Sequence, residues 1–329
     1  YLNSSGFSKM MGAKTSELLH AESFGGRDYT WKGSRATSKA FTATGSDSAF
    51  FRELRAYGIS FTLPRSQLFS KSWHLDEISI AELDLLLRVG SKADVSMGDS
   101  PNSPGVLAAG FGINPDLSKL SFDLIDVADA TFRWGVSSTT QGKIEGAPLT
   151  ATKNRVAGTW QLKLGGGKLT QNWWRDFSIQ SLDVGISPER MVFSNGNLSI
   201  GDLKSGKSGR GKLHGEIILG AVPKLQLELN LAQIPIEALV HPAFHRYLSG
   251  TIDAPLGIEG SPNKSAGITA KTQAKISDAY LMNIPVFEAL SLLLDSSRLR
   301  QLPLTEGTID FETGAEEWRV NDLDSACDK

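Results

Sequence analysis

The sequence predicts a mainly β protein with a few short helices. Apolar and polar residues alternate over long stretches, which is the pattern of a strand with one buried and one exposed face. Turn signals rich in glycine or asparagine separate several of these stretches. Spacing typical of an amphipathic helix is confined to short segments. We therefore expect strands to dominate the 329-residue chain.

The composition is that of a folded protein whose partners are not polyanions. Hydrophobic residues make up 40% of the chain, which is enough for a large core. The 34 basic and 36 acidic residues are scattered and give a net charge of -2, so we expect no nucleic-acid binding. The single cysteine, Cys327, excludes an internal disulfide and a zinc-ribbon cluster. No stretch approaches the ~20 apolar residues of a membrane-spanning helix, and the start at Tyr1 suggests that an anchoring segment lies outside this sequence.

Two helices are expected in the first 60 residues. The first covers residues 8–19, where apolar residues recur on one side. The second covers residues 48–57, with Asp47 as the N-cap and Gly58 as the residue that ends it.

Strands are expected from residue 59 onward, where the apolar period changes to two. The clearest examples are residues 59–63, 78–87, 182–186, 225–231 and 268–276. Asn195-Gly196 predicts a tight hairpin between residues 191–193 and 198–200. Gly165-Gly166-Gly167 predicts another turn, and residues 99–104 a looser connection.

Two short helices are expected to interrupt the strands of the second half. They cover residues 236–248 and 286–294, and each follows a proline, Pro235 or Pro285, that suits the first turn of a helix. Each is followed by a similar strand start: Gly250-Thr251-Ile252-Asp253 and Gly307-Thr308-Ile309-Asp310, with Gly158-Thr159-Trp160 as a looser copy. The spacings are unequal, so we expect no repeat of fixed period.

One motif imitates a nucleotide-binding loop. Residues 201–208 match the Walker A pattern at every specified position. A phosphate-binding loop must also open a helix, whose N-terminus holds the phosphates. Gly209, Gly211 and Gly215 follow at once and lower the helix propensity. We therefore favour a flexible, basic hairpin tip over a nucleotide site.

Two sets of side chains could be given a chemical role. Three possible metal ligands stand four residues apart: Glu237, His241 and His245. Pro242 would break the helix that could align them, so a polar helix joint is the preferred interpretation. Four carboxylates flank the strand at residues 78–87: Asp76, Glu77, Glu82 and Asp84. They could serve acid–base chemistry, but a solvated strand face is preferred, and without a nucleophile elbow or zinc-protease motif we expect no enzyme activity, metal or cofactor.

Basic and aromatic residues could instead contact lipid. Four basic residues could touch anionic headgroups: Lys204, Lys207, Arg210 and Lys212. A solvated loop is the simpler interpretation. The pairs Trp173-Trp174 and Phe50-Phe51 could bind sugar or lipid, although packing is the default role of such residues.

The two ends of the chain carry motifs of a known family. The opening segment Tyr1-Leu2-Asn3-Ser4-Ser5-Gly6-Phe7 is one of them, and a short helix between Ile234-Pro235-Ile236-Glu237-Ala238-Leu239 and Leu248-Ser249-Gly250-Thr251-Ile252 is another. Leu256 to Gly260, Asp278 to Pro285 and the strand pair at Glu306 to Leu323 continue the second motif. These segments resemble AsmA-like proteins, whereas residues 88–233 are only compatible with that family.

The resemblance implies a periplasmic β structure, anchored to the inner membrane of a Gram-negative bacterium by a helix that precedes Tyr1. AsmA-like proteins are related in style to TamB and to bridge-like lipid transfer proteins, and the family has no catalytic residues to carry over. It further implies an N-terminal region, 1–232, continuous with a C-terminal unit, 233–329. We expect an elongated, strongly bent antiparallel sheet that forms a groove with capping helices.

One apolar face of such a sheet could hold acyl chains, at ~0.8 kcal/mol per buried methylene. The candidate residues of this face are Leu225, Leu227, Leu229, Leu231, Ile252, Leu256, Ile258, Ile309 and Phe311. A lipid-handling scaffold for envelope biogenesis is the expected function, with phospholipid as ligand and an envelope protein as a further partner. If helices fill the face, the alternative is an assembly protein that binds an envelope partner through its sheet edges.

Overall fold

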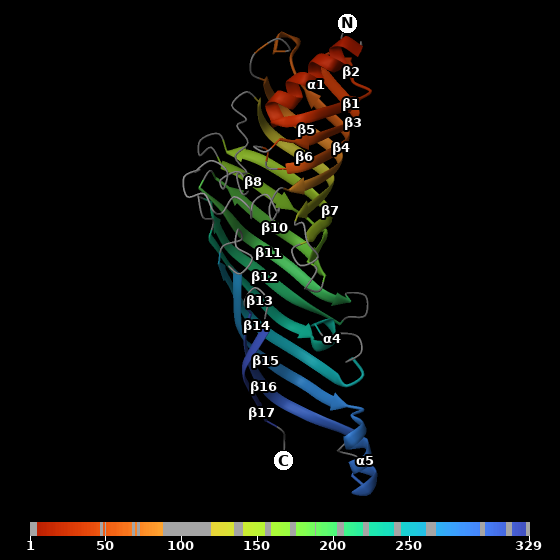
Figure 1. Ribbon diagram of the computed structural model, residues 1–329, viewed down its shortest axis with the longest axis vertical. Coiled ribbons are helices and arrows are strands. Elements are labelled where there is room, and N and C mark those ends of the chain that lie inside the picture. Colours follow the sequence, from red (N-terminus) through yellow and green to blue (C-terminus); the bar gives the residue numbers. More distant parts are fainter. Residues whose placement is uncertain are drawn as a thin grey trace. The chain divides into compact units, whose positions relative to one another are not determined.

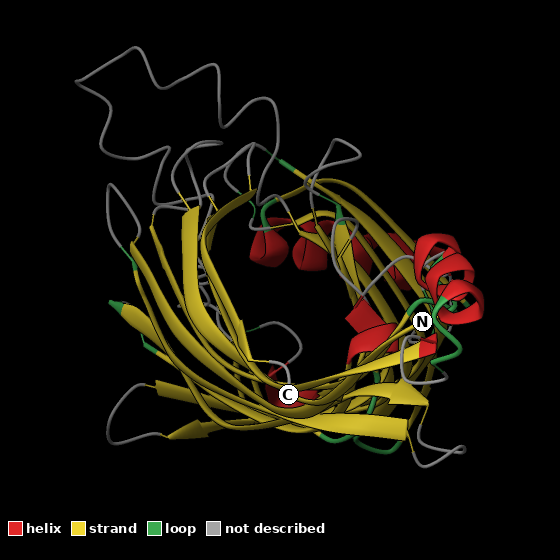
Figure 2. Cartoon of the chain, turned by 90° about the horizontal axis from the view of Figure 1, so that it is seen from below, coloured by secondary structure: helices red, strands yellow, loops and turns green. Residues whose placement is uncertain are grey.

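The computed structural model confirms the mainly β fold class. It describes residues 5–46, 49, 51–67, 70, 73–87, 120–134, 141–154, 159–171, 176–187, 189–202, 207–219, 224–239, 245–260, 268–296, 300–313 and 318–326. The strands in these ranges belong to one mixed sheet of 17 strands (Figure 1). Strands make up most of the described chain, and only short helices accompany them (Figure 2).

Contacts between Cα atoms divide the chain into two units. Unit 1 comprises Tyr1–Trp174, Ile179–Ser194 and Glu216–Pro223, and unit 2 comprises Arg175–Ser178, Asn195–Gly215 and Lys224–Lys329. The division passes through three strands: β10 (Phe177–Ile186), β11 (Arg190–Asp202) and β12 (Lys207–Ile218). The boundary expected between residues 232 and 233 falls inside β13 (Lys224–Pro235) and stays a prediction about the family's organisation.

Unit 1 begins with a helix and continues in strands. Its elements are α1 (Ser5–Leu19), β1 (Ala21–Arg27), β2 (Thr30–Lys32), β3 (Arg35–Gly45), β4 (Phe51–Thr62), the single turn η1 (Arg65–Gln67), β5 (Trp73–Leu87), β6 (Leu120–Trp134), β7 (Gly142–Asn154), β8 (Thr159–Leu164) and β9 (Lys168–Gln171). α1 packs against β1 and confirms the first predicted helix. The turn predicted at Gly165-Gly166-Gly167 joins β8 to β9, with positive φ at Gly166 and Gly167.

The sheet of unit 1 departs from the expected antiparallel pattern at one of the strand pairs whose register is described. Strands β2 to β5 pair antiparallel in chain order, and so do β6 to β8. β5 and β6, in contrast, run parallel. Parallel neighbours need a crossover connection, and residues 88–119, which include the connection expected at 99–104, lie outside the described ranges.

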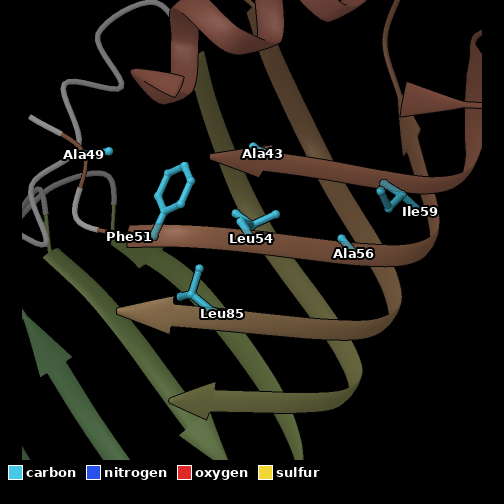
Figure 3. Packing of buried hydrophobic residues seen from close by; sticks show 7 residues of the cluster. All are labelled: Ala43, Ala49, Phe51, Leu54, Ala56, Ile59 and Leu85. Atoms are coloured by element: carbon cyan, nitrogen blue, oxygen red, sulfur yellow. The ribbon is translucent and has the colours of Figure 1, made fainter. Parts of the chain in front are cut away.

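Two apolar clusters among the described residues contribute to the core of unit 1. One gathers around Trp31, Leu63 and Trp73. The other joins β3, β4 and β5 through Ala43, Leu54 and Leu85. Ala43 lies opposite Leu54 and Leu54 opposite Leu85 in the strand registers, so their side chains share one face of the sheet (Figure 3).

The helix predicted at residues 48–57 is wrong, because β4 occupies most of this segment. A register irregularity between Phe51 and Glu53 places the buried residues Phe51 and Leu54 three positions apart, which imitates the spacing of a helix. Gly58, expected to end the helix, has a φ of 61° inside the strand. A glycine in this conformation marks a bulge in a strand.

The hairpin predicted at Asn195-Gly196 is also wrong. β11 continues through both residues without reversing. Asn195 has a φ of 50°. The amide Nδ2 of Asn197 donates hydrogen bonds to the backbone oxygen and to Oδ1 of Asn195, each at 3.2 Å. The left-handed conformation that asparagine tolerates is therefore accommodated within one strand.

Unit 2 continues with long antiparallel strands. After its parts of β10, β11 and β12 come β13, α4 (Ile236–Leu239), β14 (Leu248–Gly260), β15 (Ile268–Met282), α5 (Pro285–Leu293), β16 (Gln301–Thr313) and β17 (Trp318–Ala326). Strands β13 to β17 pair antiparallel in chain order, and β13 to β16 lie side by side in Figure 1.

The two helices predicted in the second half occur, one of them much shorter than expected. α5 matches the helix predicted at 286–294 and has Pro285 at its start. α4 ends at Leu239, residues 240–244 lie outside the described ranges, and the chain is already a strand at Leu248. The repeated sequence Gly-Thr-Ile-Asp at residues 250–253 and 307–310 lies inside β14 and β16, on either side of β15.

Candidate functional site

Unit 2 carries a continuous apolar surface across three adjacent strands. In antiparallel pairs, directly opposite residues project from the same face of the sheet. Leu227 lies opposite Ile258, and Ile258 opposite Ala270. The same register fixes one face, which we call the apolar lane and define as Leu225, Leu227, Leu229, Leu231 and Ile234 of β13, Ile252, Ala254, Leu256 and Ile258 of β14, and Ala270, Thr272, Ala274 and Ile276 of β15.

The nine residues predicted from alternation occupy positions on this one face. Seven of them belong to the apolar lane as defined above. Phe311 lies in register with Thr272, and Ile309 with Ala274, which places both β16 positions on the same side. The side chains of Ile309 and Phe311 lie outside the described part of the structure.

Burial varies along the apolar lane. Leu225, Leu229, Leu231 and Leu256 are buried, whereas Leu227, Ile252 and Ile258 are half-buried. The half-buried residues keep apolar surface that further burial would remove from water. Thr272 places a buried hydroxyl in the lane, and its Oγ1 has no hydrogen-bond partner within the described ranges. The lane therefore combines a packed centre with accessible apolar atoms.

The opposite face of the same strands is polar. Gln226 lies opposite Glu259, and both side chains are exposed. Further along, Lys271 Nζ lies 3.0 Å from Glu312 Oε1 in an exposed ion pair between β15 and β16. This contrast is typical of an antiparallel sheet with one face buried and the other exposed to solvent.

Glycines of β12 extend the apolar side toward β11. Gly209 and Gly211 are buried, and a Cβ at Gly211 would lie 3.4 Å from side-chain carbons of Leu198, Leu229 and Leu231. A Cβ at Gly209 would approach the Ile234 side chain to 2.3 Å. Because β12 has no side chain at Gly209 or Gly211, the apolar residues of β11 and β13 can approach each other over these two positions.

α4 lies at one end of the apolar lane and contacts β13 and β14. Ile236 at the start of this helix is buried, and its Cδ1 would lie 3.1 Å from a Cβ at Gly250 of β14. β13 bulges just before the helix, where Gln233 has a positive φ. The backbone N–H of Gln233 donates to Asp253 Oδ1 at 2.8 Å, so the aspartate of the first Gly-Thr-Ile-Asp segment stabilises this bulge.

Two of the four predicted headgroup residues, Arg210 and Lys212, do not lie on the apolar side. Arg210 and Lys212 are exposed and alternate with the buried Gly209 and Gly211, so they project from the polar face. Lys204 lies outside the described ranges, and so does the side chain of Lys207. Trp173-Trp174 and Phe50 also lie outside them, whereas Phe51 is fully buried and serves packing.

Neither the Walker-like segment nor the set Glu237, His241 and His245 has the helix that its chemical role would require. The Walker-like segment ends β11 and leads into strand β12, so no helix follows it to hold phosphates. Glu237 belongs to α4, His245 lies in an exposed turn beyond that helix, and His241 is not among the described residues. A single continuous helix therefore does not align the three possible metal ligands.

A different cluster of polar groups appears in unit 1. His74 Nε2 lies 3.6 Å from Asp76 Oδ1 and 3.5 Å from Asp123 Oδ2, across the parallel strands β5 and β6. All three side chains are partly or largely exposed, as are many acidic groups that bind no ion. Asp84 pairs with Arg133, whereas Glu77 and Glu82 are exposed to solvent. The four carboxylates of the predicted acidic cluster therefore do not share one set of neighbours.

Comparison with known proteins does not test the resemblance to AsmA-like proteins, which stays a prediction. No protein-family model matches the sequence, and no curated protein matches it. Within the described ranges, no helix has the length and apolar character needed to cross a bilayer.

Proposed function

We propose that this protein handles lipid and that the apolar lane shields acyl chains from water. The observation that carries the proposal is the register of β13 to β15, which gathers their apolar residues on one face. Leu227 and Ile258 lie opposite each other there and are half-buried. At ~0.8 kcal/mol per methylene, an acyl segment of about ten carbons would gain roughly 8 kcal/mol before the entropy of binding is subtracted.

The proposed role needs no catalytic residue or cofactor. In the setting implied by the AsmA-like motifs, the ligand is a phospholipid and the protein works in the periplasm, held at the inner membrane, in envelope biogenesis. These terms come from the motifs at the two ends of the sequence. Fractionation of a Gram-negative host that produces the protein tests the compartment, and recovery from the cytoplasm would contradict it.

Lipid extraction and native mass spectrometry of protein purified without detergent test the proposal. The test variant combines Leu227→Asn and Ile258→Asn, which make one accessible pair of the apolar lane polar. The control combines Gln226→Asn and Glu259→Gln, the neighbouring pair on the opposite face of the same strands. We expect phospholipid on the unaltered protein and the control, and at least about fivefold less on the test variant.

Two results would contradict lipid binding by the apolar lane. One is a folded, lipid-free protein that also fails to take up added fatty acid. The other is equal lipid on both variants, with circular dichroism showing that each is folded. Either result would favour the alternative assembly protein, in which the same residues form an ordinary core.

A further inference from the structure

Helix α5 directs apolar side chains into solvent. The exposed fractions are 73% for Leu292, 80% for Leu293 and 66% for Leu294, the C-cap residue of the helix. Val286, earlier in the helix, is 64% exposed. The one buried side chain of α5 is Ser291. Phe287 is half-buried, but the leucines at the end of α5 face solvent, whereas a surface helix usually turns its apolar residues toward the protein.

The end of α5 is held by defined hydrogen bonds, so the leucines do not owe their exposure to fraying. The Leu294 N–H donates to the Leu290 oxygen at 2.9 Å, and the Ser296 N–H to the Ser291 oxygen at 3.0 Å. Asp295 between them adopts a left-handed conformation with a φ of 46°. This is the pattern of a Schellman motif, which fixes a helix C-terminus.

A side-chain contact holds the polar side of α5 toward the protein. Arg300 Nε donates a hydrogen bond to Ser291 Oγ at 3.1 Å. This bond ties the helix to the segment that enters β16. Rotation that would bury the leucines would break it and would expose Ser291.

The arrangement of the leucines fits a fluid apolar phase better than a protein groove. Successive helical residues are about 100° apart, so three consecutive leucines span about 200° around the helix axis. A helix that binds in a groove instead uses residues three or four apart on one face. Leu292, Leu293 and Leu294 form a convex tip, which lipid can surround from all sides.

Arginine and tyrosine side chains accompany the segment that leads into α5. Asn283 Nδ2 donates to the Arg246 backbone oxygen at 2.8 Å, and the Met282 N–H to the Tyr247 oxygen at 2.9 Å. The Arg246 guanidinium lies 4.5 Å from the centre of the Tyr247 ring, and Tyr280 is exposed. Such side chains combine an apolar body with a polar tip and suit the headgroup layer of a membrane.

We propose that α5 docks the protein on the surface of a lipid bilayer, with Leu292, Leu293 and Leu294 inserted below the headgroups. α5 follows the end of β15, where Figure 1 shows it beyond the strands of unit 2. The segment from Pro285 to Arg300 carries two acidic residues, Glu288 and Asp295, and two basic residues, Arg298 and Arg300, so it has no net charge. Insertion of apolar groups therefore dominates, and the attachment depends little on salt.

Sedimentation of the full chain with phosphatidylcholine vesicles tests this docking. The test variant combines Leu292→Asp and Leu293→Asp. The control is Ile218→Asp in β12, which also replaces an exposed branched apolar side chain. We expect the unaltered protein and the control to sediment with vesicles and the test variant to lose at least about tenfold in partition coefficient, because burial of one leucine is worth about that factor.

Added phosphatidylglycerol and a rise in NaCl from about 0.05 M to about 0.5 M should change the binding by less than about threefold. The Leu227→Asn, Ile258→Asn variant should bind vesicles like the unaltered protein, so docking and acyl binding can fail independently. Absence of vesicle binding by the folded protein, or equal binding by the Leu292, Leu293 variant, would overturn the proposal. The exposed leucines would then be a surface for a protein partner.

Discussion

Leu229 of β13 lies directly opposite Leu256 of β14, and the two side chains are only 3% and 5% exposed. On the other side of Leu229, a Cβ at Gly211 would lie 3.4 Å from its Cδ1. The next pair along the same strands, Leu227 and Ile258, is half-buried. The apolar lane thus has a packed centre that contributes to stability and an accessible pair beside it that can contact a ligand.

Leu229→Ala should lower the free energy of unfolding by about 2–4 kcal/mol, because it removes buried methyl groups and leaves a cavity. Leu227→Ala should cost clearly less, since that side chain is half-buried. Chemical denaturation measures both, with Gln226→Ala on the exposed face as a control expected within about 0.5 kcal/mol of the unaltered protein. Equal losses at Leu229 and Leu227 would show that the centre is not packed as the structure indicates.

Gly215→Ala should destabilise the protein by several kcal/mol or prevent its folding. Gly215 has a φ of 137°, and a Cβ there would lie 2.2 Å from the Gln226 backbone oxygen. Gly146 has a φ of 68° but no atom within 4 Å of the added Cβ, so Gly146→Ala should cost only about 1–2 kcal/mol for its backbone conformation. Thermal unfolding compares the two, and similar losses would refute the close approach of β12 to β13.

The strands around residues 225–231 and 268–276 of unit 2 could be predicted from the sequence because apolar and polar residues alternate there without interruption. The leucines at 225, 227, 229 and 231 define a face on their own, and the structure places all four on one side of β13. The partner strands could not be deduced from alternation alone, since register depends on which residues meet. The glycine-rich run after Ser208 likewise could be excluded as a helix, but its role in bringing neighbouring apolar side chains together required the fold.

The errors arose where bulges interrupt a strand. The irregularity beside Phe51 converts an alternating pattern into a helical one, and Asn195-Gly196 is locally indistinguishable from a hairpin turn. The approach of His74 to Asp123 depends on a parallel pairing between distant segments and leaves no local signal. The run Leu292-Leu293-Leu294, in contrast, was visible in the sequence, and only its exposure was not.

The bidentate pair between Arg133 and Asp84 should stabilise the parallel strands β5 and β6. Arg133 Nε and Nη2 donate to Asp84 Oδ1 and Oδ2, each at 2.8 Å. A double-mutant cycle of Arg133→Lys and Asp84→Asn should give a coupling of about 0.5–1 kcal/mol, because both groups are partly exposed and lysine cannot donate from two positions.

The control cycle uses Lys143 and Glu145, whose charged atoms lie 2.6 Å apart within one strand. That pair connects no separate strands, so we expect a smaller coupling there. Both values should fall at high salt. A larger coupling for Lys143 and Glu145 would argue against a structural role for the Arg133 pair.

Stability at high pH should depend on Tyr29. Burial raises the pKa of its phenol to about 12, from about 10 in an unfolded chain. The folded state therefore holds the phenol proton more tightly, and the resulting stabilisation is complete below pH ~10 and is lost as the pH rises toward ~12. The ring lies against Gly26, where a Cβ would come within 2.7 Å of Cζ. Denaturation at pH ~9 and ~11.5 should show a smaller alkaline loss of stability for Tyr29→Phe than for the unaltered protein. Equal losses would show that the Tyr29 phenol is solvated in the folded state.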